Sequence, residues 1–560
     1  MSLSHDSIVG GVMLRVGIML DSYTASAWVA KIVEDIQTSG FAQVELVVLN
    51  YPSAQTRPSL KTRLRNHWRL TLFHLYEQWD YRRNKAHHDA KASMNLTSLL
   101  NGVPSITVHP VRKGFTDRIP EDELAEIRSQ DLDVLFRFGF RIIQGGILSA
   151  ARYGVWSFHH GDNLEYRGGP ALFWEIYERN PISGTILQIL TDSLDGGRVI
   201  YRSHSSTDQT SLYRSRNPIY WKTADFALRR LRDLHMHGIE HIHALFTYCE
   251  QDTYTRGIYR TPNTLQMVLF MARLLSRSLQ ARIASWRFGS RPQWFLAIRR
   301  RSAAHGFDDP SNYRLMLPPK DRFYADPFLV ERDGKTYLFL EDFRFSEGRA
   351  VISYFELGPD GSPSTPVEVL RRPYHLSYPF LFTHEGQMYM IPETKENRTV
   401  ELYRATSFPT TWTLEAVLLN DIYAVDATIL KINDKFWMFA GVSNGRHSNC
   451  DELGLFFADS LTGPWLPHPR NPVLSDVRRS RPAGALFFDG ERLIRPSQDC
   501  GKAYGYALVF SEVLTLTETK YEERPIARLD PGWVRGNLGT HTYTRTEQFE
   551  VIDGNFPAKI

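Results

Sequence analysis

The second half of the chain repeats one pattern about every 50 residues, and this repetition restricts the folds that it can adopt. Each repeat has a polar hairpin turn followed by an aromatic-rich strand, and the clear copies begin at Asp333, Glu385, Asn433 and Asp489. A fifth, weaker copy begins at Leu538. Because this period is typical of propeller blades, residues 310–560 are predicted to form an all-β five-bladed propeller.

The first half has a different pattern, in which short apolar strands alternate with helices. The strands "LRVGIML" and "VELVVLN" flank a stretch with helical spacing, and "DVLFRFGF" is a third buried strand. This alternation is typical of an open, mostly parallel sheet, so residues 12–215 are predicted to form an α/β Rossmann-like domain. Residues 216–300 are predicted to form a helical connector. This connector either links the two domains or mediates the formation of a homodimer. The chain is therefore expected to be multidomain.

An insertion at residues 58–90 is predicted to form a basic amphipathic helix. Lysines and arginines surround an apolar stripe made of Leu64, Trp68, Leu72, Leu75 and Trp79. We expect this helix to pack on its own domain or on a second subunit, and a membrane-surface role is the alternative.

Composition and cysteine usage limit the classes of binding partner and the cellular compartment that are expected. Lysine and arginine number 66 against 62 acidic residues, which is too even for a surface that binds nucleic acid. No apolar run approaches the roughly 20 residues of a membrane span, so no integral membrane contact is expected. The histidines near Gly238 lack a completed ligand set, and no metal is predicted. Three scattered cysteines and the lack of a signal-peptide pattern favour a cytoplasmic protein.

Three motifs of the first half occur in a fixed order. "VWSFHHGDNLEYRGG" places His159 near the end of a strand and Arg167-Gly168 in a turn, and "LTDSLDGG" follows. Together they resemble the catalytic domain of formyltransferases that use 10-formyltetrahydrofolate. The resemblance implies that His159 and Asp195 are catalytic and that Ser157 replaces the family's asparagine as a weaker oxyanion donor.

The same resemblance implies a folate site and an acceptor site. The residues expected at the folate are Phe138, Gly139, Phe140, Ile142, Ile143 and Asp192. On the acceptor side we expect His160, Arg167 and Gly168, with His160 as a neighbour of the reactive histidine rather than a catalytic group.

The propeller repeats carry a second resemblance. "ADPFLV", "DGKTYLF" and "ADSLTGPW" resemble the five-bladed propellers of family-43 glycoside hydrolases. This implies Asp326 as a base and Asp426 as an aspartate that tunes pKa values, while Arg481 stands where an acidic glutamate is expected. Glu393 is a further carboxylate expected to face the centre, and His541 is expected in the central channel. Lacking the acid, the propeller is predicted to bind carbohydrate or to act as a scaffold.

Both resemblances combine into one functional hypothesis. It is a cytoplasmic N-formyltransferase that moves the formyl group of 10-formyltetrahydrofolate to an amino sugar or a sugar nucleotide, with a sugar-binding propeller. In the first alternative, the propeller is an active glycoside hydrolase or glycosyltransferase and the α/β domain is accessory. In the second alternative, the protein is a non-catalytic glycan-binding protein.

Overall fold

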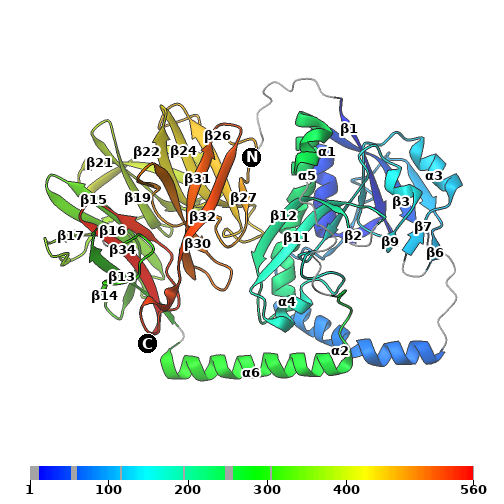
Figure 1. Ribbon diagram of the computed structural model, residues 1–560, viewed down its shortest axis with the longest axis horizontal. Coiled ribbons are helices and arrows are strands. Elements are labelled where there is room, and N and C mark those ends of the chain that lie inside the picture. The colour runs from blue at the N-terminus through cyan, green and yellow to red at the C-terminus, as the bar shows by residue number, and fades with distance from the viewer. Residues whose placement is uncertain are drawn as a thin grey trace. The chain divides into compact units, whose positions relative to one another are not determined.

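The computed structural model describes residues 12–51, 60–113, 116–192, 196–245, 257–289, 291–302 and 305–558 (Figure 1). These residues form two compact units. The first unit extends to Leu274 and the second begins at Leu275, except that His204–Ser206 group with the second. We describe each unit by itself.

An open seven-stranded sheet forms the centre of the first unit, in the order β12-β11-β10-β8-β1-β3-β5. The strands from β5 to β10 run parallel, and β11 is antiparallel to β10. This agrees with the predicted α/β sheet. The strands are β1 (Leu14–Leu20), β3 (Ala42–Asn50), β5 (Ser105–Val108), β8 (Val134–Arg137), β10 (Val155–His159), β11 (Ile182–Ile189) and β12 (Arg198–Ser206).

Helices and short strands surround this sheet. The helices of the first unit are α1 (Ala27–Thr38), α2 (Leu60–Asn84), α3 (Glu121–Arg128), α4 (Phe173–Glu178) and α5 (Leu212–Ala244). The short strands are β2 (Thr24–Ser26), β4 (Ser93–Asn95), β6 (Val111–Lys113), β7 (Thr116–Arg118) and β9 (Ile142–Ile143). The long helix α6 (Thr264–Phe288) begins in the first unit and continues past Leu274 into the second.

Helix α5 belongs to the core of the first unit. Its residues Trp221, Phe226 and Leu231 are buried in the same apolar cluster as α1 and the sheet. The first part of the predicted connector therefore folds with the α/β domain, because its apolar face completes the core. Gly238 has a left-handed φ of 75° and breaks the helix. Among the described residues, the histidines around it form no group that could hold a metal.

The predicted helix in the insertion is present as α2, and its packing face agrees with the prediction only in part. Phe73 and Tyr76 are buried against Phe173 and Phe270, and Leu72 of the predicted stripe packs on the same cluster. Leu75 and Trp79, which were expected to pack, are 56% and 55% exposed, and the side chains of Leu64 and Trp68 lie outside the described residues. Both sides of this helix carry apolar residues, so periodicity alone could not identify the side that the fold covers.

Glu175 of α4 is buried in the first unit, and its Oε1 atom has no hydrogen-bond partner in the part of the chain that the structure describes. Burial raises the pKa of Glu175 to about 8, against the attraction of Arg216. The folded protein then holds a proton that the unfolded chain releases above about pH 4.5. Stability is therefore expected to fall as the pH rises from about 4.5 to about 8.

The variant Glu175→Gln is expected to remove this fall and to unfold at a higher temperature than the wild type at about pH 8. Thermal unfolding across the pH range measures the effect. Glu165→Gln, at an exposed glutamate of the same unit, is the control and should keep the wild-type pH dependence. An unchanged slope in Glu175→Gln would contradict the assignment.

The second unit consists of five antiparallel sheets that form the blades of a propeller (Figure 1). The first three blades are built from consecutive strands. The first is β15 (Arg322–Arg332), β16 (Lys335–Arg344), β17 (Arg349–Leu357) and β18 (Val367–Leu370); the second is β19 (Ser377–His384), β20 (Gln387–Thr394), β21 (Thr399–Ser407) and β22 (Thr411–Asn420). The third is β23 (Tyr423–Ile432), β24 (Lys435–Ser443), β25 (Glu452–Ala458), β26 (Leu466–Pro467) and β27 (Leu474–Ser475).

The fourth blade is built from consecutive strands, and the fifth blade combines strands from the two ends of the unit. The fourth blade contains β28 (Arg481–Pro482), β29 (Phe487–Asp489), β30 (Arg492–Asp499), β31 (Ala507–Leu516) and β32 (Tyr521–Leu529). The fifth contains β13 (Arg291–Arg300), β14 (Arg314–Met316), β33 (Tyr543–Arg545) and β34 (Phe549–Ala558), with β13 paired to β34 along its whole length. The ring therefore includes β13, which lies upstream of the predicted start at residue 310.

The innermost strands of three blades share a bulge that positions the central side chains. The pairing of β15, β19 and β23 with their neighbours shifts at Asp326, Tyr378 and Asp426 respectively. All three residues have left-handed φ values, 50°, 46° and 54°. A non-glycine residue adopts this conformation at an energetic cost, so its repetition marks a positioned site.

Candidate functional site

Five buried polar residues meet where the innermost strands of the propeller converge, and we call them the central cluster. They come from every blade except the second and are Asp326, Asp426, Arg481, His541 and Asp553. The sequence motifs predicted the first four at the centre. Asp553 of β34 carried no motif and was missed.

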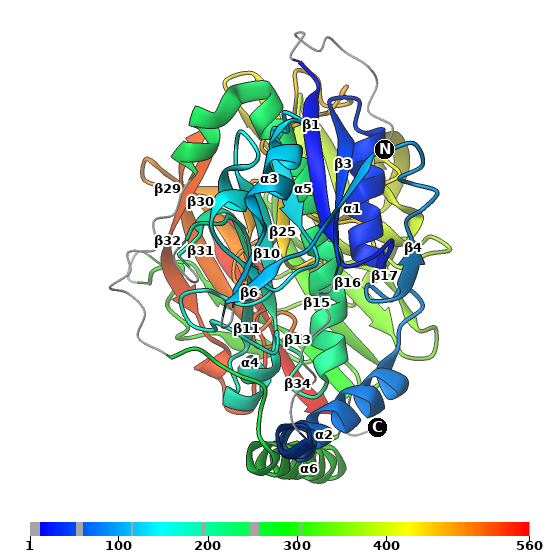
Figure 2. The same ribbon diagram turned by 90° about the vertical axis from the view of Figure 1, so that its right-hand side faces the viewer.

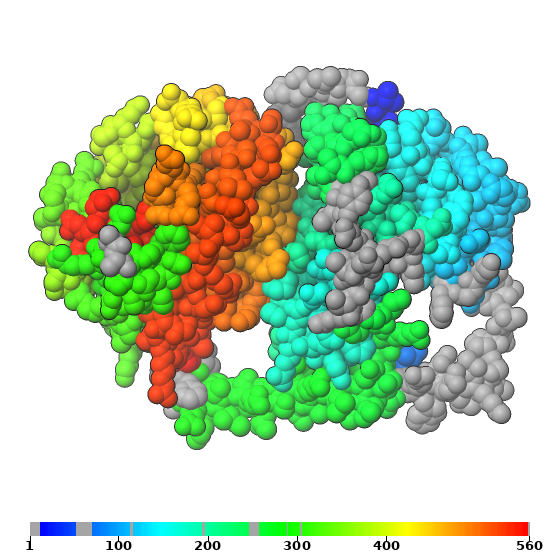
Figure 3. Space-filling model, in the orientation of Figure 1, coloured from blue at the N-terminus to red at the C-terminus, as the bar shows by residue number. Residues whose placement is uncertain are grey.

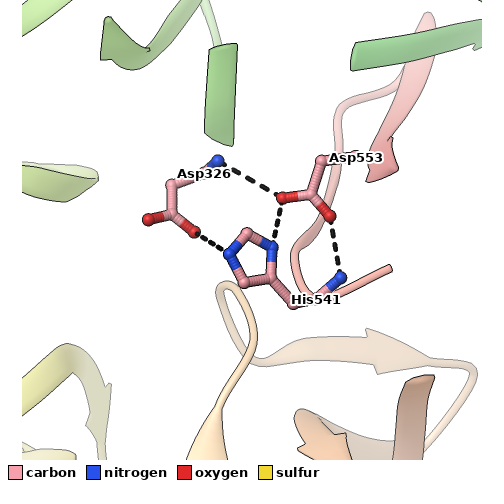
Figure 4. A group of neighbouring side chains, drawn as sticks. All are labelled: Asp326, His541 and Asp553. Atoms are coloured by element: carbon pink, nitrogen blue, oxygen red, sulfur yellow. Dashed lines mark hydrogen bonds and ion pairs between the residues drawn. The ribbon is translucent and has the colours of Figure 1, made fainter. Parts of the chain in front are cut away.

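His541 bridges two aspartates of the cluster (Figure 4). Its Nδ1 lies 2.5 Å from Asp553 Oδ2, and its Nε2 lies 3.6 Å from Asp326 Oδ1. Burial opposes the charged imidazolium, but the carboxylates of Asp553 and Asp326 outweigh it and raise the pKa of His541 to about 9. His541 therefore carries a positive charge at neutral pH, between two negative ones.

Asp326 and Asp553 are further fixed by neutral donors. Asp326 accepts hydrogen bonds from Thr542 Oγ1 at 2.6 Å and from the backbone N–H of Tyr378 at 3.2 Å. Asp553 accepts from the backbone N–H of Asp326 and of His541 (Figure 4). The carboxylates are thus held by the fold before any ligand arrives.

These three side chains could also hold a cation. Asp326, His541 and Asp553 each offer one ligand atom, and the atoms lie within 4.8 Å of one another. A metal ligand must be the neutral imidazole, whereas His541 here is stabilised as the imidazolium. The proton and a metal ion would therefore compete for the same position.

Arg481 joins the remaining carboxylates. Its Nε donates to Asp426 Oδ2 at 2.6 Å and its Nη2 donates to Oδ1 at 3.2 Å, and Nη2 also lies 3.5 Å from Glu393 Oε2. Gln498 Nε2 donates to Asp426 as well, at 3.0 Å. Burial raises the pKa of Asp426 against the attraction of Arg481. The arginine thus occupies the place where a glycosidase acid was expected, and it brings Asp426 and Glu393 together.

Aromatic rings border the cluster, and the sequence motifs did not predict them. Trp294 of β13 stacks on His541 with ring centroids 4.0 Å apart. Tyr504 contacts His541 edge-on and lies under the Arg481 guanidinium at 4.9 Å, yet it is 49% exposed. Tyr504 lies in the loop between β30 and β31, outside the repeated pattern. It offers a ring face beside buried charges, an arrangement that suits a sugar ring.

A second acid–base pair lies on the first and second blades. Glu341 Oε1 lies 3.3 Å from His375 Nε2. Burial raises the pKa of Glu341, while the bond to Glu341 raises the pKa of His375 to about 9 despite partial burial. His375 is therefore positively charged at neutral pH.

In the first unit, the predicted formyl-transfer residues are only partly together. His159 Nε2 lies 3.0 Å from the carbonyl oxygen of Tyr166. Ser157 is fully buried, and its Oγ accepts from both Nε and Nη2 of Arg137, at 3.0 and 2.9 Å. The serine oxygen is thus already held by a guanidinium. Asp195 lies outside the described residues.

The other predicted residues of this unit divide between a small pocket and the protein interior. Ile142, Ile143 and Asp192 line a pocket of about 90 Å³ together with Arg137 and His159. Phe138 instead stacks on the rings of Phe136 and Phe158 in the apolar core. The backbone of Gly139 and Phe140 lies against Asp21, which accepts a hydrogen bond from Phe140 N–H.

The residues predicted at the acceptor side have structural contacts. His160 stacks on Tyr220 with ring centroids 3.9 Å apart, and burial holds its pKa well below the usual value. The Arg167 carbonyl accepts from Tyr259 N–H at 2.8 Å. A Cβ atom on Gly168 would lie 2.2 Å from the Tyr259 carbonyl oxygen, so only glycine fits this turn.

Comparison with known proteins places the similarity in the propeller. A family model described as "Glucosamine inositolphosphorylceramide transferase 1, N-terminal" matches residues 317–531. Proteins named glucosamine inositolphosphorylceramide transferase 1 are 34% identical over 209 residues in Oryza sativa subsp. japonica and 33% identical over 205 residues in Arabidopsis thaliana. Each match covers 36% of this chain, and 28% and 27% of the respective relatives. The chain therefore spans less than a third of the length of these relatives.

Solved structures of glycoside hydrolases are also similar. An exo-β-1,3-galactanase from Clostridium thermocellum is 14% identical with a TM-score of 0.31, covering 38% of this chain and 53% of that one. A thermostable family-43 glycoside hydrolase is 13% identical with a TM-score of 0.30, covering 39% of this chain and 83% of that one.

The family and its relatives correct the functional hypothesis. They are named as a glucosamine inositolphosphorylceramide transferase, and this overturns the prediction of a formyltransferase with 10-formyltetrahydrofolate as donor and an amino sugar as formyl acceptor. The alternative in which the propeller belongs to a glycosyltransferase agrees better with these names.

Proposed function

We propose that the chain takes part in glycosyl transfer and that its propeller binds the sugar at the central cluster. The observation that carries this proposal is the repeated bulge at Asp326 and Asp426, which turns the Asp426 carboxylate toward Arg481 and the Asp326 carboxylate toward His541. Asp326, Asp426 and Arg481 lie within the stretch 317–531 that the transferase family model matches. By analogy with the names of the relatives, the acceptor we propose is the headgroup of an inositol phospholipid.

The contacts favour binding of a sugar over hydrolysis of a glycosidic bond. Hydrolysis requires a carboxylic acid that protonates the leaving oxygen, and the guanidinium of Arg481 cannot donate a proton at neutral pH. The proposed contacts are Glu393 and Arg481 for the hydroxyl groups and the exposed ring of Tyr504 for a sugar face. Asp326 and Asp426 then act by holding His541 and Arg481 in place.

The variant Tyr504→Ala is expected to weaken binding of a hexose or hexosamine by about tenfold, because it removes the stacking surface together with the ring contacts to His541 and Arg481. Isothermal titration calorimetry with a panel of monosaccharides and inositol phosphates measures this. Phe488→Ala is the control, since Phe488 is similarly exposed at 54% but lies on the hairpin between β29 and β30. Sugar affinity equal in both variants, or release of free sugar from an oligosaccharide by the wild type, would count against the proposal.

A further inference from the structure

Helix α6 has two apolar sides, and the fold covers only one. Met267 and Phe270 are buried in the first unit, where Phe270 packs on Phe173 of α4. Large apolar residues on the opposite side are exposed, and Figure 3 shows α6 as the green rod along the lower edge of the view. With 3.6 residues per turn, its large apolar residues fall on one stripe and are between 43% and 83% exposed: Leu265, Leu269, Leu275, Leu279, Ile283 and Trp286.

The charges on α6 all have one sign. The helix carries arginines at positions 273, 277, 282 and 287 and no aspartate or glutamate. A helix exposed to water over its whole length ordinarily carries polar residues of both signs on its outer face. The combination of an exposed apolar stripe with positive charge alone therefore favours an apolar, negatively charged partner.

Helix α2 extends this surface. The first half of α6 lies beside α2 in both ribbon views (Figures 1 and 2), and the rings of Tyr76 and Phe270 join the two helices at 5.2 Å. Leu75 and Trp79 of α2 are exposed, and the Arg83 guanidinium lies 5.6 Å from the Trp79 ring. Two helices that touch thus both expose apolar residues together with arginines.

We propose that α6, assisted by α2, docks the protein on the surface of a bilayer that contains anionic lipids. The apolar stripe would lie at the boundary between headgroups and acyl chains, with the arginines extended toward the lipid phosphates. Trp286, 83% exposed, is the residue type that prefers this boundary. The helix would lie in the plane of the membrane, and none of the described helices is long and apolar enough to cross one.

A second copy of the chain fits this surface less well. Two α6 helices packed through the same stripe would bring arginines together, and neither helix has a carboxylate to pair them. Anionic lipid supplies negative charge without such repulsion. This inference uses none of the propeller residues and is independent of the proposed function.

The test is co-sedimentation of the purified chain with vesicles of phosphatidylcholine, with or without phosphatidylserine. We expect binding to the vesicles that contain phosphatidylserine. Leu279→Glu should weaken it by at least about tenfold, because the change removes an exposed leucine that the lipid would bury and adds a charge that the lipid repels. Ala281→Glu makes the same change of charge on the opposite side of the helix and should weaken it by less than about threefold. Arg282→Gln should weaken it by about fivefold.

Several results would overturn the inference. One is a wild-type chain that stays in the supernatant with phosphatidylserine vesicles, and another is an equal loss in Leu279→Glu and Ala281→Glu. A third is a dimer in analytical ultracentrifugation that Leu279→Glu dissociates, which would make the stripe a subunit interface. Circular dichroism confirms that each variant is folded. Sugar binding by the propeller is measured separately, so failure here leaves the proposed function standing.

Discussion

Replacing Glu550 with alanine is expected to lower the free energy of unfolding of the propeller by about 3–5 kcal/mol. Glu550 of β34 pairs with Arg299 of β13, at 2.5 Å between Oε2 and Nη2, and both side chains are almost fully buried, at 3% and 2% exposed. Removing the carboxylate leaves a guanidinium buried without a counter-charge. The loss falls on the strand pair that closes the ring.

Further hydrogen bonds of Arg299 and Glu550 explain why these side chains are held in place in the interior. Arg299 also donates to the carbonyl oxygens of Asp309 and Gly306, at 2.7 and 2.8 Å, and Tyr543 donates its hydroxyl to Glu550 Oε1 at 2.9 Å. The guanidinium is therefore anchored in the interior and cannot turn to solvent without breaking further bonds.

Urea denaturation followed by tryptophan fluorescence measures the loss. The control is Glu547→Ala in the same hairpin, because Glu547 pairs with Arg301 at 3.5 Å but is 89% exposed. That surface pair should contribute less than about 1 kcal/mol. A loss below about 1 kcal/mol in Glu550→Ala as well would show that the buried pair does not hold the ring closed.

Replacing Arg481 with methionine is expected to reduce sugar affinity by up to about a hundredfold. Arg481 joins Asp426 and Glu393, and its guanidinium lies 4.9 Å from the centre of the exposed Tyr504 ring. Its loss removes a charged donor, and a hydrogen bond to a charged group contributes about 1.5–3 kcal/mol. It also frees Glu393, whose new orientation would misplace a second sugar contact.

The design of this experiment separates binding from folding. Asp426 can take up a proton when the arginine is lost, because burial already raises its pKa. The double variant Arg481→Met with Asp426→Asn should therefore be as stable as the single variant, or more stable, and still fail to bind sugar. Arg492→Met, at an arginine 49% exposed and paired with Asp489, is the control. Unchanged sugar affinity in Arg481→Met would refute the proposed contact.

Local sequence patterns predicted the propeller well but not its closure. The hairpin repeats correspond to strand pairs such as β15–β16 and β23–β24, which are close in sequence. The strand β13 was missed because its partner β34 lies at the other end of the unit, and no local pattern reports such a pairing. For the same reason the buried side of α2 was assigned only in part: Leu72 packs as expected, but Phe73 and Tyr76 pack on residues far along the chain.

The candidate site was predicted where the chain resembles family-43 propellers. That resemblance identified Asp326, Asp426, Arg481 and His541, and the two aspartates occupy equivalent bulges. Asp553 lies in the fifth, weaker copy, where no motif marked it, and Trp294 and Tyr504 lie outside the repeats; all three come to the centre through the tertiary fold. The motifs around His159 belong to the other unit, and a local motif in one unit does not report the activity of the whole chain.

The pairing of β13 with β34 also sets the order of events during synthesis. The first unit ends by Leu274, whereas β13 leaves the ribosome roughly 250 residues before the strand that pairs with it. Until then the nascent propeller is an arc with a bare strand edge, which is prone to pair with other chains. The α/β unit can thus mature on the ribosome, while the propeller closes only after its last strand has been made.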